Sequence, residues 1–240
     1  MEILEKQKTI VITQPTYIPW LGYFEQIARA DVFVFLDIVQ YVHQEWNNRN
    51  RLKGTNGEPV WLTIPVEKHP LETNIEDIKI SSNKHSWATK HLNTISSLLG
   101  KTPYIQEFLP QLARLYGKEN TNLCEFNIEL IKLISQWLGL KVKFVRASEL
   151  GPSGKRTEML LDICLQLEAA HYYSPAGAAV YLENERHILE NAGISISYQR
   201  WEHPIYAQKF GGFLSHMSVL DAIMNAGPER TREFIRQRND

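Results

Sequence analysis

The sequence predicts an α/β fold in which helices cover a doubly wound, mostly parallel sheet. Short apolar runs of strand length alternate with segments of helical periodicity, and this alternation occurs in both halves of the 240-residue chain. Residues 31–37 are nearly all apolar, which suits a parallel strand that is covered on both faces. Together these features indicate a Rossmann-like arrangement.

The first βαβ unit occupies residues 9–37. Residues 9–13 predict a buried strand, residues 21–30 a helix and residues 31–37 the next strand. Pro15 and Pro19 prevent a helix from starting before Trp20. The turn after the first strand therefore lies at the carboxyl edge of the sheet, where open α/β folds bind ligands.

The next stretch contains a polar, basic segment followed by helices. Residues 40–57 predict no regular element, whereas residues 59–66 predict a strand and residues 76–80 a short strand. Helical periodicity is expected at about 84–99, 104–116 and 120–138. These helices form an insertion at about 84–138.

The second half returns to strand and helix alternation. Strands are expected at 141–145, 171–174 and 194–199, and helices at 157–167, 181–191 and 216–226. The charged tail from residue 229 is expected to fray or lie on the surface. Because no linker or repeat interrupts the chain, residues 1–240 are interpreted as a single α/β domain.

Composition restricts the function classes. The formal net charge is −1, so no global basic field exists to hold a polyanion. Cys124 and Cys164 lie in apolar helical patterns and predict free buried thiols, without a metal site. The N-terminus lacks an apolar signal core and no run has the length of a membrane span, which predicts a cytoplasmic protein without membrane insertion.

The turn from Gln14 to Tyr23 is the first candidate binding element. Large aromatics at the mouth of a sheet are costly to expose, and Tyr17, Trp20 and Tyr23 could stack on a planar or sugar ligand. The Gln14 amide would add a donor and an acceptor. The alternative is that the aromatics pack under a neighbouring loop.

Two basic segments are candidates for binding an anion. Arg49 and Arg51 can grip carboxylate or phosphate oxygens, and the interleaved Asn48 and Asn50 add donors. A solvated loop is the alternative. Lys84 lies beside a predicted helix start, whose free N–H groups suit phosphate, although its neighbours could simply cap the helix.

The segment from 201 to 208 follows the last predicted strand and is the candidate for acid–base chemistry. His203 is the candidate general base at neutral pH, while Tyr206 and Gln208 are expected to contact substrate. Glu202 would point away from His203 in an extended chain. The glycines of 151–157 do not have P-loop spacing, so a Walker-type phosphate site is excluded.

Several ordered motifs resemble the WbqC-like family. They are QPTYIPWLGYF at 14–24, the strand that ends in Asp37, WNNRNR at 46–51 and WLTIPV at 61–66, followed by AAHYYSPAGAAVYL, GISISYQ, HPIYAQ and LSHMSVLDAIMNAG in the second half. The resemblance covers about residues 9–227. The turn at 174–177 has fewer glycines than the family pattern, which leaves the role of this turn open.

The resemblance implies a role in bacterial surface-polysaccharide (O-antigen) biosynthesis. The leading expectation is an acyl or aminoacyl transferase, such as a glycyl transferase, that forms an amide on a nucleotide-linked amino sugar. Its partners would be that sugar nucleotide and an activated donor, for which an aminoacyl-tRNA is suitable. No metal is expected.

A more distant similarity concerns the first βαβ unit. It is similar to pantothenate synthetase and other nucleotidylyltransferase-like folds, which implies ATP as a cofactor. The histidine motif of those enzymes is missing between Gln14 and Tyr23. An ATP-dependent ligase that makes an acyl-adenylate is therefore the first alternative, and a non-catalytic binding protein of a polysaccharide assembly complex is the second.

Overall fold

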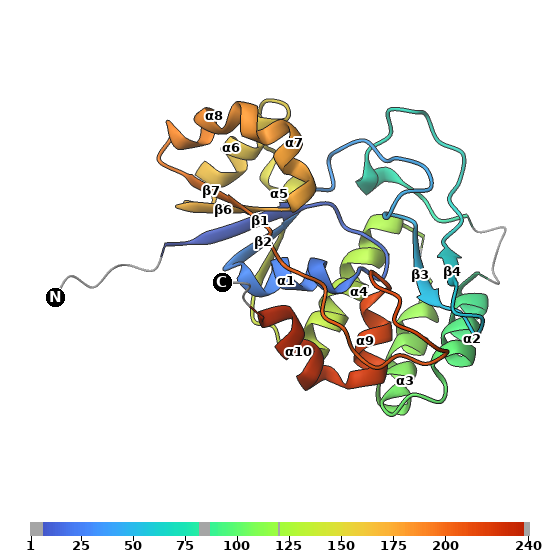
Figure 1. Cartoon of the computed structure of the whole chain (residues 1–240). Helices are drawn as coiled ribbons and strands as arrows, with labels where there is room; N and C mark the ends of the chain where they lie inside the picture. The colour runs from blue at the N-terminus through green and yellow to red at the C-terminus, as the bar shows by residue number, and fades with distance from the viewer. Residues whose placement is uncertain (1–6, 82–86, 120, 238–240) are drawn as a thin grey trace.

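The computed structural model describes residues 7–81, 87–119 and 121–237, and it contains a central parallel sheet (Figure 1). All four strand pairings in this sheet are parallel. Its order is β5 (Lys143–Arg146), β2 (Val32–Phe35), β1 (Thr9–Thr13), β6 (His171–Ser174), β7 (Ser195–Tyr198). The chain thus winds from β1 to one edge and then from β6 to the other. This confirms the predicted Rossmann-like α/β fold and places its switch point between β1 and β6.

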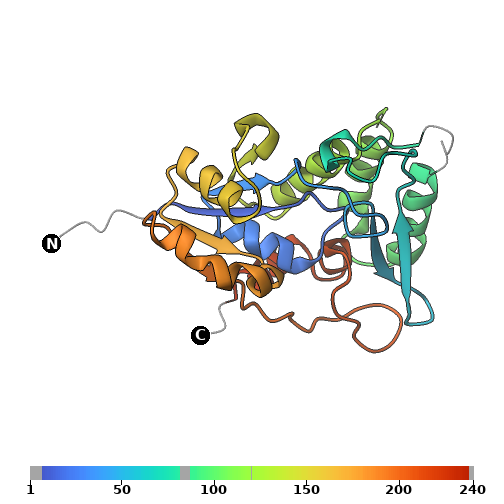
Figure 2. The same cartoon turned by 90° about the horizontal axis from the view of Figure 1, so that it is seen from above.

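Side-chain alternation along β1 divides the hydrophobic core between the two faces of the sheet. Ile10 and Ile12 join one cluster, which contains residues of α6 (Thr157–Gln166) and α8 (Arg186–Glu190). Val11 joins the other cluster. Figure 2 shows that helices lie on both sides of the sheet.

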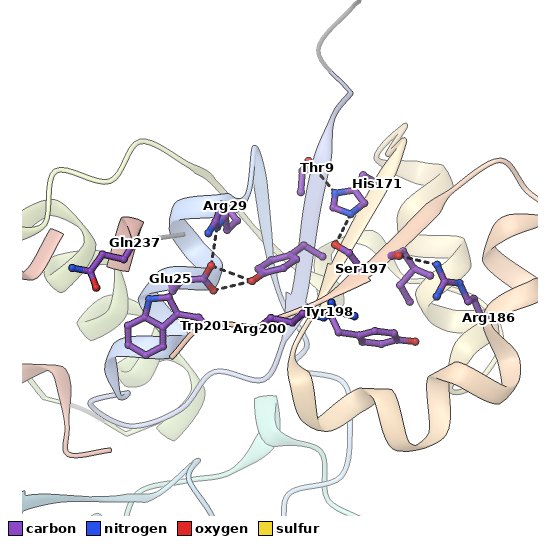
Figure 3. A pocket seen from close by; sticks show the side chains of 12 residues that line it. Thr9, Glu25, Arg29, His171, Arg186, Ser197, Tyr198, Arg200, Trp201 and Gln237 are labelled. Atoms are coloured by element: carbon purple, nitrogen blue, oxygen red, sulfur yellow. Dashed lines mark hydrogen bonds and ion pairs between the residues drawn. The ribbon is translucent and has the colours of Figure 1, made fainter. Parts of the chain in front are cut away.

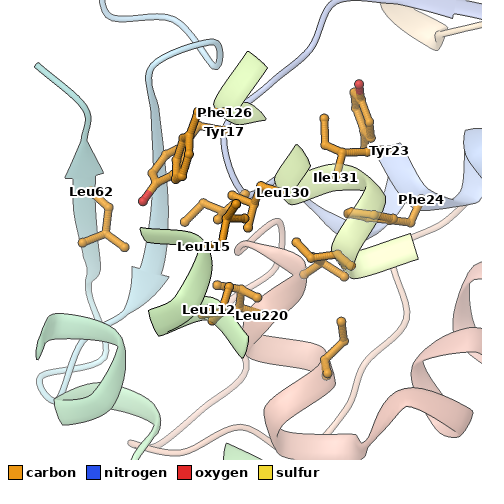
Figure 4. Packing of buried hydrophobic residues seen from close by; sticks show 14 of the residues in the cluster. Tyr17, Tyr23, Phe24, Leu62, Leu112, Leu115, Phe126, Leu130, Ile131 and Leu220 are labelled. Atoms are coloured by element: carbon orange, nitrogen blue, oxygen red, sulfur yellow. The ribbon is translucent and has the colours of Figure 1, made fainter. Parts of the chain in front are cut away.

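A helical region extends the second cluster away from the sheet. It comprises α1 (Leu21–Arg29), α2 (Trp87–Leu99), α3 (Ile105–Tyr116), α4 (Leu123–Trp137), α9 (Val219–Ala226) and α10 (Pro228–Arg236). Leu112, Leu130 and Leu220 pack together in its centre (Figure 4). The helices predicted within 84–138 are confirmed over their described residues.

The basic segment contains a strand that the sequence interpretation missed. Strand β3 (Arg49–Lys53) pairs antiparallel with β4 (Pro59–Thr63) in a separate two-stranded sheet. Its polar composition hid the alternation that buries Asn50 and Leu52. Residues 76–80 are also not a strand, because η1 (Ile75–Asp77) is a 3₁₀ turn and Lys79 and Ile80 form only isolated bridges, to Asn122 and Val66.

Two predictions for the second half were wrong in detail. The tail forms α10, which buries Thr231, Phe234 and Ile235 at helical spacing and starts with Pro228 at a favourable position. The single helix expected at 181–191 is divided into η3 (Ala176–Ala178), α7 (Ala179–Leu182), η4 (Glu183–Glu185) and α8.

Both cysteines are buried free thiols, and burial raises the pKa of each to about 12. Among the described residues, none of the helices has both the length and the apolar character to span a bilayer. The same residues contain no cluster of three or more potential His, Cys, Asp or Glu metal ligands.

Candidate functional site

The carboxyl edge of the sheet carries a cavity of about 490 Å³ at the switch point. Thr13 and Pro175 line it where β1 and β6 end, and Arg51 reaches it from β3. The long segment after β7 closes another side. We call this space the switch-point cavity, and its volume is in the range of small-molecule sites.

Aromatic side chains form much of its wall. The lining rings are Trp20, Tyr23, Trp46 and Trp201. The Trp20 ring meets Trp201 edge-on at 5.7 Å between centroids and stacks on His216 at 5.0 Å. Such faces hold planar rings and sugars without requiring charge.

Local backbone geometry positions Trp20. It is the extended N-cap residue of α1 and bridges to Ser218 in the segment after β7. The backbone N–H of Ser218 donates to the oxygen of Arg51 at 3.0 Å, which ties this segment to β3. Gly22 has no Cβ, and the Trp20 ring occupies the space that a Cβ would need.

Three amides supply donors and acceptors to the cavity. Gln26, Asn50 and Gln199 line it. Gln199 Nε2 donates to the oxygen of Gly22 at 2.7 Å, and Gln26 Nε2 donates to Gln199 Oε1 at 2.8 Å. Gln26 Oε1 is buried and has no hydrogen-bond partner within the described part of the chain. The wall therefore retains an unused acceptor.

The charged lining of the switch-point cavity is basic. Arg51 supplies a positive charge to the lining, His216 adds an imidazole, and none of the described lining residues is Asp or Glu. The Arg51 guanidinium carbon lies 5.9 Å from the Trp46 ring centroid and 5.6 Å from that of Trp61. The arrangement favours an anionic ligand beside an aromatic wall.

His216 adds a titratable ring to the lining of this cavity. Burial, and then the nearby Arg51 charge, lower its pKa from the ordinary 6.5, so the ring is neutral at pH 7. Its φ of 59° is unusual for a residue other than glycine. Nδ1 lies 2.9 Å from the Ser215 hydroxyl.

A polar network around Glu25 lies in the wall of a larger open cavity of about 660 Å³ (Figure 3). Buried Glu25 accepts hydrogen bonds from Tyr173, Gln199 and Arg29. Trp201 lines both cavities.

The larger cavity also contains a hydrogen-bonded histidine. His171 Nε2 lies 2.8 Å from the Ser197 hydroxyl, and its Nδ1 lies 3.3 Å from that of Thr9. Arg186 pairs with Glu190 at 2.5 Å. Because many of its polar groups are paired with one another, this cavity is a weaker candidate for the site.

Of the residues predicted from sequence, Trp20, Tyr23, Asn50 and Arg51 meet in the switch-point cavity. Gln14 lines a neighbouring cavity, and its backbone oxygen accepts a hydrogen bond from the Tyr23 hydroxyl at 3.0 Å. The turn and the basic segment are therefore brought together, although they are separated in sequence.

The structure corrects the expected position of Tyr17. Its side chain is fully buried, and its hydroxyl lies 2.7 Å from Nδ1 of His91 and 2.5 Å from the Tyr116 hydroxyl. Ile18 has a φ of 33°, and this bend accompanies the divergence of Tyr17 from Trp20. Tyr17 packs in the helical region and is not part of the cavity lining.

Asn48 and Arg49 also lie away from the switch-point cavity. Asn48 is buried and its Nδ2 donates to the oxygen of Ile64. Arg49 places its guanidinium 4.5 Å from the Trp61 ring centroid. Lys84, like Ser82, Asn83 and His85, falls outside the described residues.

The predicted base and its neighbours lie behind the cavity wall. His203 stacks on Trp20 and approaches His216 at 5.0 Å between centroids, but it is not a lining residue. Tyr206 donates to buried Asp221 at 2.9 Å, and Gln208 bonds both backbone groups of Leu214. These contacts shape the segment after β7.

Sequence reasoning missed several lining residues. His216, Trp46, Gln26 and Gln199 were not predicted as site residues, and the role of the turn 175–177 was left open. Gln199 ends one predicted strand and this turn follows another, so their position at the carboxyl edge was the available signal. His216 gave no such signal, because it lies far along an irregular segment.

The fold and site define a class: a Rossmann-like α/β protein with a ligand-sized cavity at its switch point. The chain belongs to the WbqC-like protein family, whose pattern matches residues 14–233. It is 31% identical over 225 residues to the uncharacterized protein Rv1507c of Mycobacterium tuberculosis (strain ATCC 25618 / H37Rv), covering 92% of this chain and 95% of that protein. No solved structure matches the chain.

Proposed function

We propose that this protein is an acyl or aminoacyl transferase that binds a nucleotide-linked amino sugar in the switch-point cavity and forms an amide on it. The observation that carries the proposal is the lining: aromatic walls, amide side chains and Arg51, with no Asp or Glu among the described lining residues. A sugar nucleotide has planar, hydroxylated and anionic parts that match these three groups.

Each group has a defined part in binding. Arg51 holds phosphate oxygens, and its planar fork favours paired contacts. Trp20 and Trp201 offer faces for the base or the sugar ring.

His216 replaces His203 as the residue that accepts the proton in this proposal, because it lines the cavity. The neutral amine of the sugar attacks the donor carbonyl, the new C–N bond forms and the bond to the leaving group breaks. The amine proton passes to the neutral His216 ring. A lowered pKa keeps this ring able to accept a proton at pH 7.

The binding test compares two arginines of one strand. Arg49 and Arg51 are both half-buried and both lie over Trp61, but only Arg51 lines the cavity. Arg51→Gln is expected to weaken sugar-nucleotide binding in calorimetry by about 10- to 100-fold, and Arg49→Gln to leave it unchanged. Equal sugar-nucleotide affinity in the wild type and both variants would contradict the proposal.

The turnover test uses mass spectrometry. Sugar nucleotides with a free amine and activated acyl or aminoacyl donors should give an amide product, and His216→Gln should lower its rate by about 100-fold or more. Because the His216 pKa is lowered from 6.5, the contribution of this ring should be lost only in acid, as the ring becomes protonated; the loss should be absent in His216→Gln.

Two outcomes would favour other functions. Amino-acid-dependent exchange between ATP and pyrophosphate would indicate a ligase that makes its own acyl-adenylate. Tight ligand binding without turnover for any donor would indicate a binding protein.

A further inference from the structure

A second cavity adjoins the switch-point cavity at the same edge of the sheet. Its volume is about 410 Å³, and Thr13, Thr16, Trp46 and Pro175 line both spaces. Four shared wall residues mean that ligands in the two cavities would lie next to each other. We call the smaller space the second chamber.

The two cavities occupy opposite faces of the sheet. Ile12, Leu160 and Tyr172 line the second chamber, and all three belong to the core cluster beneath α6 and α8. Tyr23 lines the switch-point cavity and belongs to the cluster on the other face. The pair of cavities therefore spans the crevice at the point where the strand order reverses.

The charges of the two cavities are opposite. Glu45 lines the second chamber, and none of its described lining residues is Lys, Arg or His. Its side chain is exposed, and among the described residues its carboxylate makes no ion pair or hydrogen bond. The amide groups of Gln14 and Asn47 and the hydroxyl of Tyr181 complete the polar lining.

We infer that the second chamber binds the donor substrate and that Glu45 selects a donor with a protonated amine, that is, an aminoacyl group. Assigning this ligand as the donor rests on the proposed function, whereas the preference for a cationic amine rests on the lining alone. A carboxylate without a partner attracts an ammonium group, and the apolar floor of Ile12 and Leu160 accepts a small side chain.

The geometry fits a transfer between the chambers. An acyl carbon at the shared wall of Thr13, Thr16 and Trp46 would meet an amine that enters from the switch-point cavity. The sugar amine attacks that carbon, the bond to the activating group breaks and the proton leaves toward His216. The α-ammonium of the donor stays at Glu45 and takes no part in the bond changes.

The test uses two small probes that differ in charge. Leucinamide is a cation at neutral pH, and N-acetyl-leucinamide is neutral and slightly larger. Ligand-observed NMR titration of the wild type should show that leucinamide binds more tightly, by roughly three- to tenfold. Glu45→Gln should remove that preference.

A matched control is Glu58→Gln, which removes the same charge from an exposed residue near β4 that lines neither cavity. This variant should keep the wild-type preference. Equal binding of both probes to the wild type, or an unchanged preference in Glu45→Gln, would overturn the inference.

The same titrations separate this inference from the proposed function. If leucinamide binding depends on Glu45 but sugar nucleotides do not bind, the second chamber binds an amine as inferred and the proposed acceptor is wrong. If sugar nucleotides bind through Arg51 but both leucine probes bind equally, the proposed function stands and the assignment of Glu45 is wrong.

Discussion

The N-terminal turn supplies aromatic rings to two regions with opposite properties. In the cluster formed by Tyr17, Trp87, His91, Tyr116 and Phe126, the rings are buried and the Tyr17 hydroxyl has two partners. In the switch-point cavity, Trp20 and Trp201 are only partly buried and face open space. We call the first region the Tyr17 cluster.

Two residues of one short turn therefore have different roles: Tyr17 contributes to stability, and Trp20 is expected to contribute to ligand binding. The Tyr17 cluster is filled with side chains, so its rings contribute through apolar burial and satisfied hydrogen bonds. The cavity lining includes two buried atoms, Gln26 Oε1 and Arg51 Nε, that have no hydrogen-bond partner among the described residues. Substitutions in the two regions should therefore affect different measurements.

The largest effect is expected for Tyr17→Ala. Removing this fully buried ring should lower the free energy of unfolding in urea by about 3–5 kcal/mol. Tyr17→Phe removes only the hydroxyl, and leaving its partners unsatisfied should cost about 1–3 kcal/mol. A loss below about 1 kcal/mol for Tyr17→Ala would contradict the stabilising role of the Tyr17 cluster.

The next effect concerns His91, whose pKa is lowered to about 4 by burial. Because its unfolded pKa is 6.5, the unfolded chain binds this proton first as the pH falls. Stability should therefore drop between pH 6.5 and 4, by about 3 kcal/mol from this residue. As the pH falls through this range, the free energy of unfolding should decrease less steeply for His91→Gln than for the wild type. An equal pH dependence in the two proteins would exclude a buried neutral His91.

A smaller effect is expected at the cavity wall. Trp20→Leu should weaken sugar-nucleotide binding by about 3- to 10-fold, because a stacking face is lost. The matched control is Trp137→Leu in the helical region, which removes a partly buried indole bonded to Gln111. This control should lower stability and leave sugar-nucleotide affinity unaltered. If calorimetry shows wild-type affinity for Trp20→Leu as well, Trp20 has only a structural role.

The smallest effect is expected for Gly22→Ala. The added Cβ overlaps the outer atoms of the Trp20 ring, which is flexible enough to move. Stability should change by less than about 1 kcal/mol, while sugar-nucleotide affinity should fall by about threefold. If Gly22 acts through Trp20, the double variant with Trp20→Leu should bind no more weakly than Trp20→Leu alone.

Much of the fold could be predicted from periodicity. Strand 171–174 and the helices near 105–116 and 123–137 were found because apolar residues recur at strand or helix spacing. Strand β3 was missed because Arg49 and Arg51 fill its outer face, and their long side chains conceal a buried alternate face. Helix α10 was missed because its apolar stripe is narrow within a charged segment.

Part of the site could also be predicted from local sequence patterns. The turn after β1 and the basic segment are visible as unusual sequences, and position after a strand indicates the carboxyl edge. The direction of each side chain was not visible. Tyr17 and Trp20 lie three residues apart, yet the bend at Ile18 sends one ring into the core and the other to the cavity.

The sequence by itself determined the strand and helix alternation, the sheet edge at which we propose that a ligand binds, and the family to which the chain belongs. Those properties depend on local periodicity and on ordered motifs. Only the tertiary structure decided which polar and aromatic residues share the cavity, because that depends on contacts across long separations. The 3.0 Å hydrogen bond between Ser218 and Arg51, for example, brings His216 to the site from the far end of the chain.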